Sequence, residues 1–276
     1  MSQALVTELP MSTRVKNPLL LQIAFLAALA GGVFHASIAH ADELTVQADR
    51  WCPYNCVPES SAPGYVIELL QAILGTHGTA ILYQVVPWDR TLIQVRDGKA
   101  DAAIGVTQHE VDTFGLLVGN EPIGYSSDCL YVAATNKLKF SKADDLNVLR
   151  KIGISSGYSY SKDLTEWLGR AENRNKVYVQ KGEVPSEINA MNLARGRLDG
   201  VIEDDHVMQQ LIYKLKLERD VVLAGCQNRT TIYVAFSPKL KGVDTKIKQF
   251  DDGISTLRKS GQLAKILAKY GLTDWK

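Results

Sequence analysis

The sequence predicts an α/β protein built from two similar lobes and preceded by a separate leader segment, and three observations support this prediction. Segments that alternate like strands and segments with the spacing of amphipathic helices follow each other along the chain. A short helix–glycine–strand pattern occurs twice, in residues 95–105 and 193–203. A separate apolar segment precedes the first predicted strand. Alternating strands and helices are typical of a largely parallel sheet covered by helices.

The N-terminus has the pattern of a secretory signal peptide. Arg14 and Lys16 precede an apolar run over residues 18–34, and Ala39-His40-Ala41 follows with small residues at its first and third positions. The run is short for a membrane span, which needs roughly 20 apolar residues. We therefore expect residues 1–41 to be a signal peptide that is removed after export to the periplasm.

Cleavage after Ala41 sets the charge of the mature protein. The whole chain has 31 basic and 30 acidic residues, and the removed segment contains two basic residues and one acidic residue. The mature chain is therefore expected to have no net charge, which argues against nucleic acid and anionic membranes as partners. We expect the mature protein to be a monomer. Translation is expected to start at Met1 or at Met11.

Four cysteines remain in the mature chain: Cys52, Cys56, Cys129 and Cys226. An even number in an exported protein predicts two disulfides. Of the three possible pairings, the short spacing favours Cys52 with Cys56 and leaves Cys129 for Cys226. A zinc site is the weaker interpretation because C-x3-C is not a usual knuckle spacing. No other metal or cofactor motif is present.

Helices and strands alternate in the first part of the mature chain. In residues 64–75 apolar side chains recur at helical spacing up to Gly75, a usual helix stop. Asp89 is predicted to cap a second helix, which Gly98 ends. The predicted strands of this part are residues 42–48, 81–86 and 101–106.

The repeated pattern links the two halves of the chain. Gly98-Lys-Ala-Asp101 and Gly196-Arg-Leu-Asp199 each lie between a helical segment and a short apolar strand. Glycine supplies the left-handed residue that ends a helix, and the aspartate opens the strand. Because the two copies are far apart, the pattern predicts two similarly built lobes and not a short-period solenoid.

The second copy is followed by elements that complete the second lobe and close the chain. A helix through Val207 and Leu215 is expected first, and two amphipathic helices end the chain with apolar stripes that cover a sheet. The strands expected between them are residues 221–223 and 231–236.

Several short motifs, taken in order, resemble the family 3 extracellular solute-binding proteins, the polar amino acid-binding components of ABC transporters. The similarity runs from about Leu44 to Trp275. Their order and spacing carry the resemblance, because no single motif is decisive. The motifs are G-Y-x-x-E-L-L at 64–70, P-W-D-R at 87–90, G-K-A-D at 98–101, I-G-I-x-x-G at 152–157, G-R-L-D-G-V-I-x-D at 196–204, Y-V-A-F at 233–236 and a C-terminal pattern at 257–271.

The resemblance implies a fold like that of type II periplasmic binding proteins, in which hinge strands join two α/β lobes around a ligand cleft. Lobe 1 is then expected to contain residues 42–130 and 232–276, and lobe 2 residues 131–231. Cys129 precedes the first implied hinge strand and Cys226 precedes the second. A disulfide between them is therefore expected to tie the hinge strands together.

The resemblance also implies the function of a binding protein without a cofactor, and not of an enzyme. Such a protein captures a small polar ligand, an amino acid or an amine, for the membrane permease of an ABC transporter. Two alternatives stay open: a periplasmic enzyme on the same scaffold, similar to cyclohexadienyl dehydratase, and a sensory ligand-binding subunit. The first alternative is weakened by the absence of the arginine that usually binds a carboxylate in this family, because the substrate of such a dehydratase is also an acid.

Aromatic residues near predicted strand ends are candidates for contact with the ligand in lobe 1. Trp51 and Tyr54 lie in the predicted Cys52–Cys56 loop, and Trp88 lies at a helix start. Clefts of open α/β sheets form at such strand ends. Each ring can stack on a ligand or fill the core.

One departure from the family concerns the carboxylate of an amino acid. Family members that bind α-amino acids usually have a Thr-x-x-Arg-like signature just after the strand that follows the Gly-x-x-Asp motif, and its arginine binds the ligand carboxylate. Here that stretch contains Thr107, and the arginine place is predicted to fall at or near Thr113. Threonine cannot replace a bidentate guanidinium. Arg90 is the remaining candidate, unless it is a solvated charge paired with Asp89 or Asp112.

The candidates in lobe 2 lie before two predicted helices. The hydroxyls of Ser156, Tyr158 and Ser159 can form an anion cradle or simply cap a helix. Asp204 stands where the resemblance implies a carboxylate for a ligand amino group, and Glu203 and Asp205 can share this role or serve only as solvated acids at a helix start. With the arginine absent, we expect a cationic ligand held by Asp204 between aromatic walls from Trp51 and Tyr54.

Overall fold

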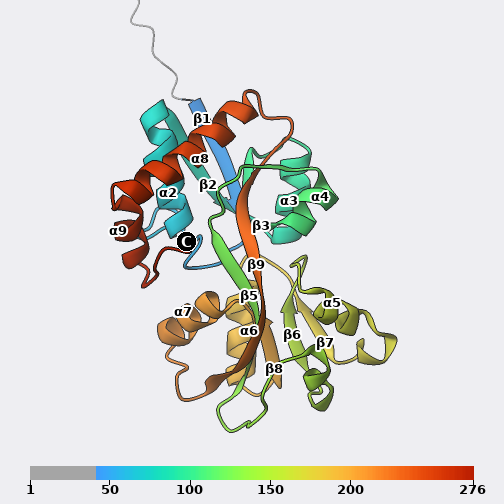
Figure 1. Ribbon diagram of the computed structural model, residues 1–276. Helices are drawn as coiled ribbons and strands as arrows, with labels where there is room; N and C mark the ends of the chain where they lie inside the picture. Colours follow the sequence, from blue (N-terminus) through green and yellow to red (C-terminus); the bar gives the residue numbers. More distant parts are fainter. Residues whose placement is uncertain (1–41) are drawn as a thin grey trace, which may run out of the picture. The chain divides into compact units, whose positions relative to one another are not determined.

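A computed structural model describes residues 42–276 of the chain. The predicted signal peptide lies outside these residues and stays a prediction. The described residues form a nine-stranded mixed sheet in the order β2-β1-β3-β9-β5-β8-β6-β7, with β4 paired to β9 (Figure 1). The strands are β1 (Asp42–Ala48), β2 (Thr79–Val85), β3 (Ala102–Thr107), β4 (Leu117–Val118), β5 (Gly124–Ala133), β6 (Ile152–Ser155), β7 (Val177–Gln180), β8 (Gly200–Glu203) and β9 (Val221–Phe236). The α-helices are α2 (Tyr65–Leu74), α3 (Trp88–Arg96), α4 (Gln108–Phe114), α5 (Lys162–Gly169), α6 (Pro185–Ala194), α7 (Asp205–Leu215), α8 (Val243–Lys259) and α9 (Gln262–Ala268).

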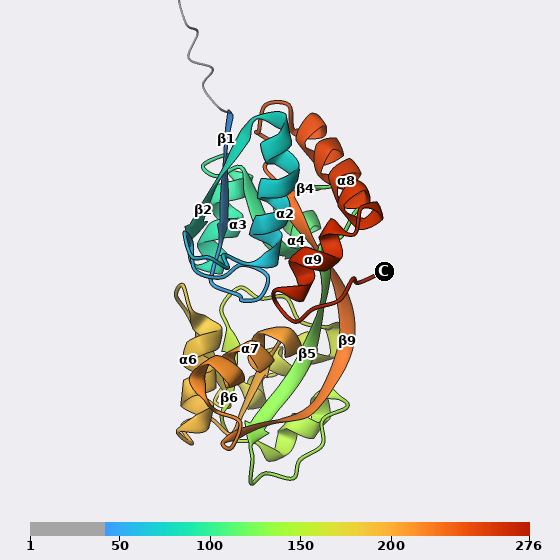
Figure 2. The ribbon, with the colours of Figure 1, turned by 90° about the vertical axis from the view of Figure 1, so that its left-hand side faces the viewer.

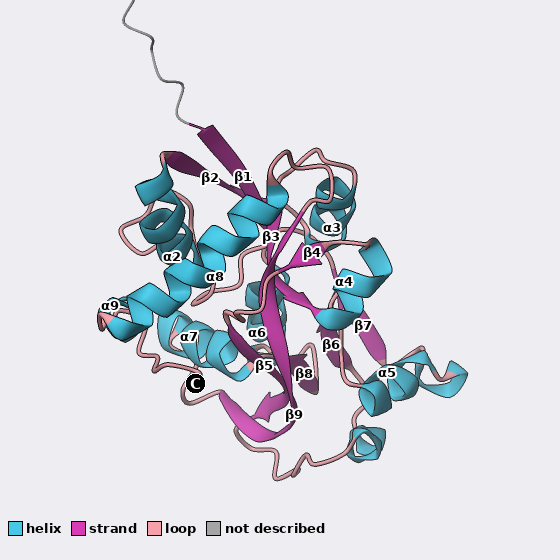
Figure 3. Ribbon diagram, turned by 45° about the horizontal axis from the view of Figure 1, so that its top comes forward, coloured by secondary structure: helices cyan, strands magenta, loops and turns pink. Residues whose placement is uncertain are grey.

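Two groups of elements lie at opposite ends of this sheet. The β1–β3 region contains strands β1 to β3 with α2, α3, α4, α8 and α9, and the β6–β8 region contains strands β6 to β8 with α5, α6 and α7 (Figures 1 and 2). In the β1–β3 region, α2 and α8 lie on one side of the strands and α3 and α4 on the other (Figure 3). Strands β5 and β9 pair with each other and run through both regions.

The predicted parallel pairing holds inside each region but not across the sheet. Strand β1 pairs parallel with β2 and β3, and β6 pairs parallel with β7 and β8. All antiparallel pairs involve β5 or β9. The sequence predicted two strands, residues 221–223 and 231–236, in place of β9. Residues 224–230 between them are largely polar and lack alternation. Their backbone nevertheless pairs with β5 through shifts of register, so β9 is one long strand.

Two predicted helix ends differ in detail from the structure. Gly75 does follow α2, but it keeps a right-handed conformation and begins a 3-10 turn, and Gly78 is the left-handed residue instead. Asp89 does not cap α3, because Pro87 occupies the N-cap position. The Asp89 side chain instead accepts a hydrogen bond from the amide of Arg90 (2.9 Å) in the first turn.

The repeated sequence pattern has the same structure in both regions. Each copy is a helix end, a glycine with positive φ and a short strand. The Asp101 carboxylate accepts from the Thr45 amide (2.8 Å), and the Asp101 amide donates to the Thr45 carbonyl (2.9 Å). Asp199 makes the same exchange with Lys151, at 3.0 Å and 2.8 Å. The aspartate therefore fixes the start of one parallel strand against its neighbour, which is a structural role.

Both predicted disulfides are confirmed. Cys52–Cys56 closes the loop that follows β1. Cys129 and Cys226 are paired residues of the β5–β9 ladder, with their Cα atoms 4.0 Å apart. They lie inside these strands and not before them, so the bridge ties together the two strands that both regions share.

Candidate functional site

A small cavity lies where the segments after β1, β3 and β6 meet. Its volume is about 50 Å³, and we call it the inner cavity. Residues of both regions line it, and none of the described lining residues is a lysine, arginine or histidine. The carboxyl ends of parallel strands are where open α/β sheets bind ligands. The lining residues are Asp49, Trp51, Trp88, Ile104, Gly105, Thr107, Glu110, Ser126, Tyr158, Ser159 and Ile232.

A larger hollow of about 700 Å³ adjoins the inner cavity, and we call it the outer groove. The two share Glu110, Tyr158 and Ser159. The groove continues between α4 and the β6–α5 segment, and much of its wall is apolar. The apolar side chains in this wall include Phe114, Ile154, Leu168 and Val179.

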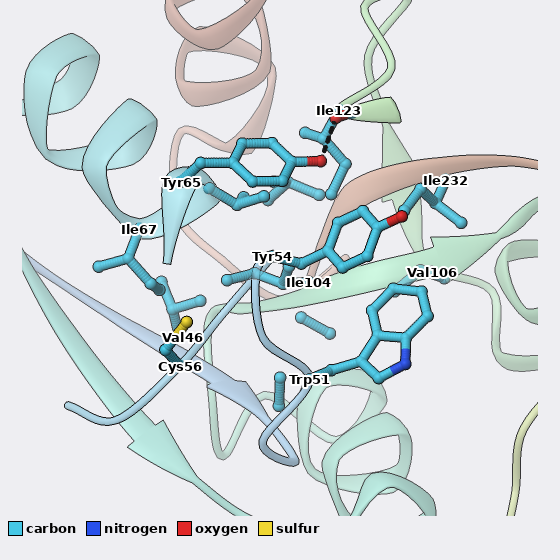
Figure 4. Close-up of a cluster of buried hydrophobic side chains, with 14 of the residues drawn as sticks. Val46, Trp51, Tyr54, Cys56, Tyr65, Ile67, Ile104, Val106, Ile123 and Ile232 are labelled. Atoms are coloured by element: carbon cyan, nitrogen blue, oxygen red, sulfur yellow. Dashed lines mark hydrogen bonds between the residues drawn. The ribbon is translucent and has the colours of Figure 1, made fainter. Parts of the chain in front are cut away.

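Trp51 and Tyr54 form a stacked aromatic pair beside the inner cavity. Their ring centroids are 4.2 Å apart, and the angle between the ring planes is 16° (Figure 4). Trp51 lines the inner cavity, whereas Tyr54 lines a separate hollow on the other side. The Tyr54 hydroxyl lies 2.9 Å from the Tyr125 carbonyl and 3.2 Å from the Asp204 carboxylate. Tyr54 therefore packs against the Trp51 ring and does not itself line the inner cavity.

Asp204 is fully committed to contacts with the protein. It is the N-cap of α7, and its carboxylate accepts from the Val207 amide (3.2 Å), the Ser127 amide (3.1 Å) and the Tyr54 hydroxyl. It faces the hollow that Tyr54 lines, not the inner cavity. Burial raises the pKa of Asp204 to about 6, and the two amides limit this rise.

Asp49 and Glu203 are buried acids with raised pKa values. Burial raises the pKa of Asp49 to about 8, although the Tyr158 hydroxyl donates to Asp49 Oδ2 (2.7 Å). Burial also raises the pKa of Glu203 to about 7, although the Ser186 hydroxyl, Trp51 Nε1 (2.9 Å) and the Asp204 amide (2.9 Å) donate to it. Two of these bonds, from Tyr158 to Asp49 and from Trp51 to Glu203, join the two regions.

Glu110 is the second acid in the wall of the inner cavity. It forms a capping box with Thr107 at the start of α4, and Trp88 Nε1 donates to its other oxygen (3.0 Å). All these donors are neutral, and burial raises the pKa of Glu110. The site therefore carries acidic groups for which its own wall supplies no cation.

Thr113, the predicted place of the missing arginine, does not line the inner cavity. Thr113 is exposed, and its hydroxyl donates to the His109 carbonyl (2.7 Å) within α4. Counting the Thr-x-x-Arg signature from Thr107 reaches Glu110, whose side chain lines the inner cavity.

The predicted site residues are divided between the inner cavity and other places. Arg90 is exposed, and Ser156 uses its amide to bind the Gln180 carbonyl (2.8 Å); neither lines the inner cavity or the outer groove. Tyr54 and Asp204 lie behind the cavity wall. The candidates that do line the inner cavity are Trp51, Trp88, Thr107, Tyr158 and Ser159.

The sequence argument missed Asp49 and Glu110, and considered Glu203 only as a neighbour of Asp204. Each of the three follows a strand of the sheet, β1, β3 or β8, or ends it. The position of acids at the carboxyl ends of strands was the signal that could have identified them. Among residues 42–276, the one cluster of possible metal ligands contains Cys129 and Cys226, whose sulfurs form a disulfide and provide no thiolate.

Comparison with known proteins identifies the family. The sequence profile of the bacterial extracellular solute-binding proteins, family 3, matches residues 44–273. The chain belongs to this family. A probable histidine-binding protein of Neisseria gonorrhoeae is 24% identical over 212 residues, which cover 77% of this chain and 76% of that protein.

Solved structures share the fold. The arginine-, lysine-, histidine-binding protein of Geobacillus stearothermophilus has a TM-score of 0.68 at 18% identity, covering 84% of this chain and 96% of that one. A histidine kinase sensor domain with similarity to periplasmic binding proteins has a TM-score of 0.66 at 18% identity, covering 83% and 95%. These similarities confirm the predicted periplasmic-binding-protein fold. Within residues 42–276, no helix has both the length and the apolar character needed to cross a membrane.

Proposed function

We propose that this chain is a periplasmic binding protein that captures a small polar solute with an amino or other cationic group and passes it to the permease of an ABC transporter. One observation carries the proposal: the inner cavity has two buried acids in its wall, Asp49 and Glu110, and no basic residue among the described residues that line it. A buried negative charge is costly unless a cation pairs with it. A cationic solute supplies that partner.

The two regions correspond to two lobes in this proposal. Lobe 1 comprises residues 42–130 and 232–276, lobe 2 comprises residues 131–231, and β5 and β9 are the hinge. A solute that contacts both lobes stabilises the closed state and so shifts the balance between open and closed forms. The permease then recognises the closed shape. The hydrogen bonds from Tyr158 to Asp49 and from Trp51 to Glu203 are contacts of this closed state.

The relatives support a solute with a basic group. One is named for histidine, and another is named for arginine, lysine and histidine. All three amino acids can carry a positive charge on their side chains. We propose that Trp51, Trp88, Thr107, Tyr158 and Ser159 contact the solute and that Tyr54 and Asp204 hold the wall in place.

One observation favours an enzyme as the second candidate. Asp49 and Glu203 are buried acids whose pKa values are raised to about 8 and about 7, and such groups can act as general acids near neutral pH. A periplasmic dehydratase on this scaffold would use them in this way. Chemical conversion of a bound solute, followed by mass spectrometry, would favour this candidate over the binding protein.

A thermal-shift screen of the chain from Asp42 onwards tests the proposal. The panel contains amines, basic amino acids, neutral amino acids and carboxylic acids of matched size. A solute present at 100 times its Kd adds about 2.7 kcal/mol to the free energy of unfolding. We expect stabilisation by cationic solutes alone. Stabilisation by carboxylic acids alone, or by no solute of the panel, would contradict the proposal.

A further inference from the structure

We propose that the solute is an amphiphilic amine without a carboxylate, whose charged head binds between Asp49 and Glu110 while its apolar arm lies along the outer groove. This inference rests on the proposed binding function and adds the chemical class of the solute. Four observations carry it: the charge of the inner cavity, its size, the apolar wall of the groove and an unpartnered hydroxyl.

The charge of the inner cavity excludes a carboxylate from the head site. Asp49 and Glu110 are 2% and 4% exposed, and every hydrogen bond that Glu110 accepts comes from a neutral donor. A ligand carboxylate would add a third acid to this enclosed wall, and like charges at close range strongly disfavour ionisation. An ammonium group neutralises the same wall.

The size of the inner cavity limits what can enter it. A volume of about 50 Å³ is a few times the roughly 10–15 Å³ that a cavity needs to hold one water molecule. A small ammonium head fits such a space, whereas the rest of a longer solute must lie elsewhere. Because the outer groove shares Glu110, Tyr158 and Ser159 with the cavity, it is the continuation available to that remainder.

The outer groove has the character of a site for an apolar arm. Phe114 and Leu168 are half-buried, and Val179 is 50% exposed, so apolar surface faces the groove from both regions. Covering such surface with an apolar group is favourable because it removes the surface from water. A second cationic group on the arm would gain less from this wall than a hydrocarbon would.

Ser155 adds an independent sign of a ligand. Its side chain is 2% exposed and lies in the wall of the outer groove, at the end of β6. Its hydroxyl oxygen has no hydrogen-bond partner among the described residues. A buried hydroxyl without a partner is unfavourable, and native structures contain few of them. A polar group of a ligand at this point of the groove can supply this partner.

Isothermal titration calorimetry with four matched probes tests the class of solute. Phenethylamine has the cationic head and an apolar arm, phenylalanine adds a carboxylate to the same skeleton, 3-phenylpropionate lacks the cation, and ethylamine lacks the arm. We expect phenethylamine to bind at least about tenfold more tightly than each of the others, a difference of about 1.4 kcal/mol. Equal or tighter binding of phenylalanine would overturn the inference while leaving the binding function intact.

Variants of α4 and α5 locate the two parts of the site. Glu110→Gln should weaken phenethylamine binding about 10-fold to 100-fold, and glutamine preserves the capping box that starts the helix. Asp112→Asn is the matched control, since Asp112 is an exposed acid on the same helix. Leu168→Ser should weaken phenethylamine binding but not ethylamine binding. Melting temperatures check that each variant is folded.

Three results would overturn the inference. The first is an equal loss of affinity for phenethylamine in Asp112→Asn and Glu110→Gln. The second is an equal loss of affinity for phenethylamine and for ethylamine in Leu168→Ser. The third is absence of binding by all four probes at millimolar concentration. In this last case the broad metabolite screen still decides separately whether the protein binds any solute.

Discussion

The two regions follow the same local plan, but the acids at their strand ends have different hydrogen bonds. Asp204, after β8, accepts from two backbone amides and a hydroxyl, whereas Asp49, after β1, accepts from the Tyr158 hydroxyl. Both side chains are buried, yet the pKa is raised to about 6 for Asp204 and to about 8 for Asp49. Amides stabilise the charge of Asp204, whereas Asp49 is largely protonated near pH 7 and can ionise when a cation binds beside it.

The comparison predicts its largest effect for binding in Asp49→Asn. The change removes the charge that faces the inner cavity and keeps the shape of the side chain. Truncating one partner of a buried charge pair costs about 2–5 kcal/mol, so the affinity for phenethylamine should fall at least about 30-fold. Calorimetry measures this loss, and the melting temperature without ligand should not fall. An unchanged affinity would remove Asp49 from the site.

Asp204→Ala should affect stability more than binding. It deletes the N-cap of α7 and leaves the Ser127 amide without its partner. We expect a loss of about 2 kcal/mol in the free energy of unfolding, from the lost cap and the lost hydrogen bond. Urea titration measures it. If the variant were as stable as the parent but unable to bind amines, the roles of Asp49 and Asp204 would have to be exchanged.

The pH dependence of stability should show the buried acids directly. The pKa of Asp49 is raised to about 8 and that of Glu203 to about 7, so both hold protons more tightly in the folded chain than in the unfolded one. Their stabilising contribution is complete below the unfolded pKa values near 4 and is lost as the pH rises through 7 and 8.

A melting series measures this effect on the unliganded protein. We expect the melting temperature to fall by a few degrees between about pH 5 and pH 9, equivalent to about 1 kcal/mol or more. Asp49→Asn should flatten the profile. A melting temperature that rises over this range in the parent chain would show that these acids are ionised without cost.

The fold was predictable because its signals are local. The helix spacing of residues 64–75 and the two glycine–aspartate motifs each produced the expected element. The two disulfides followed from the cysteine spacing and the implied fold. The continuity of β9 was not predictable, since pairing with β5 overrides the polar composition of its middle part.

The site was less predictable because it depends on which side chains converge. In the sequence Asp49 is only an acid after a strand, and Glu110 is equally well explained as part of a capping box. Counting from Thr107 reaches Glu110 in the sequence, but only the structure shows that this residue of α4 lines the inner cavity. Only the tertiary arrangement brings Asp49, after β1, and Glu110, after β3, to one cavity.

Proton release on binding tests most directly whether a cation pairs with the buried acids of the β1–β3 region. Phenethylamine stays cationic near pH 7, so its arrival beside Asp49 should lower the pKa of that group and release a proton. Calorimetry at pH 7 in buffers of different ionisation enthalpy should report a release of about half a proton or more, which Asp49→Asn abolishes. Binding that takes up protons, or exchanges none in the parent chain, would contradict the proposed pairing.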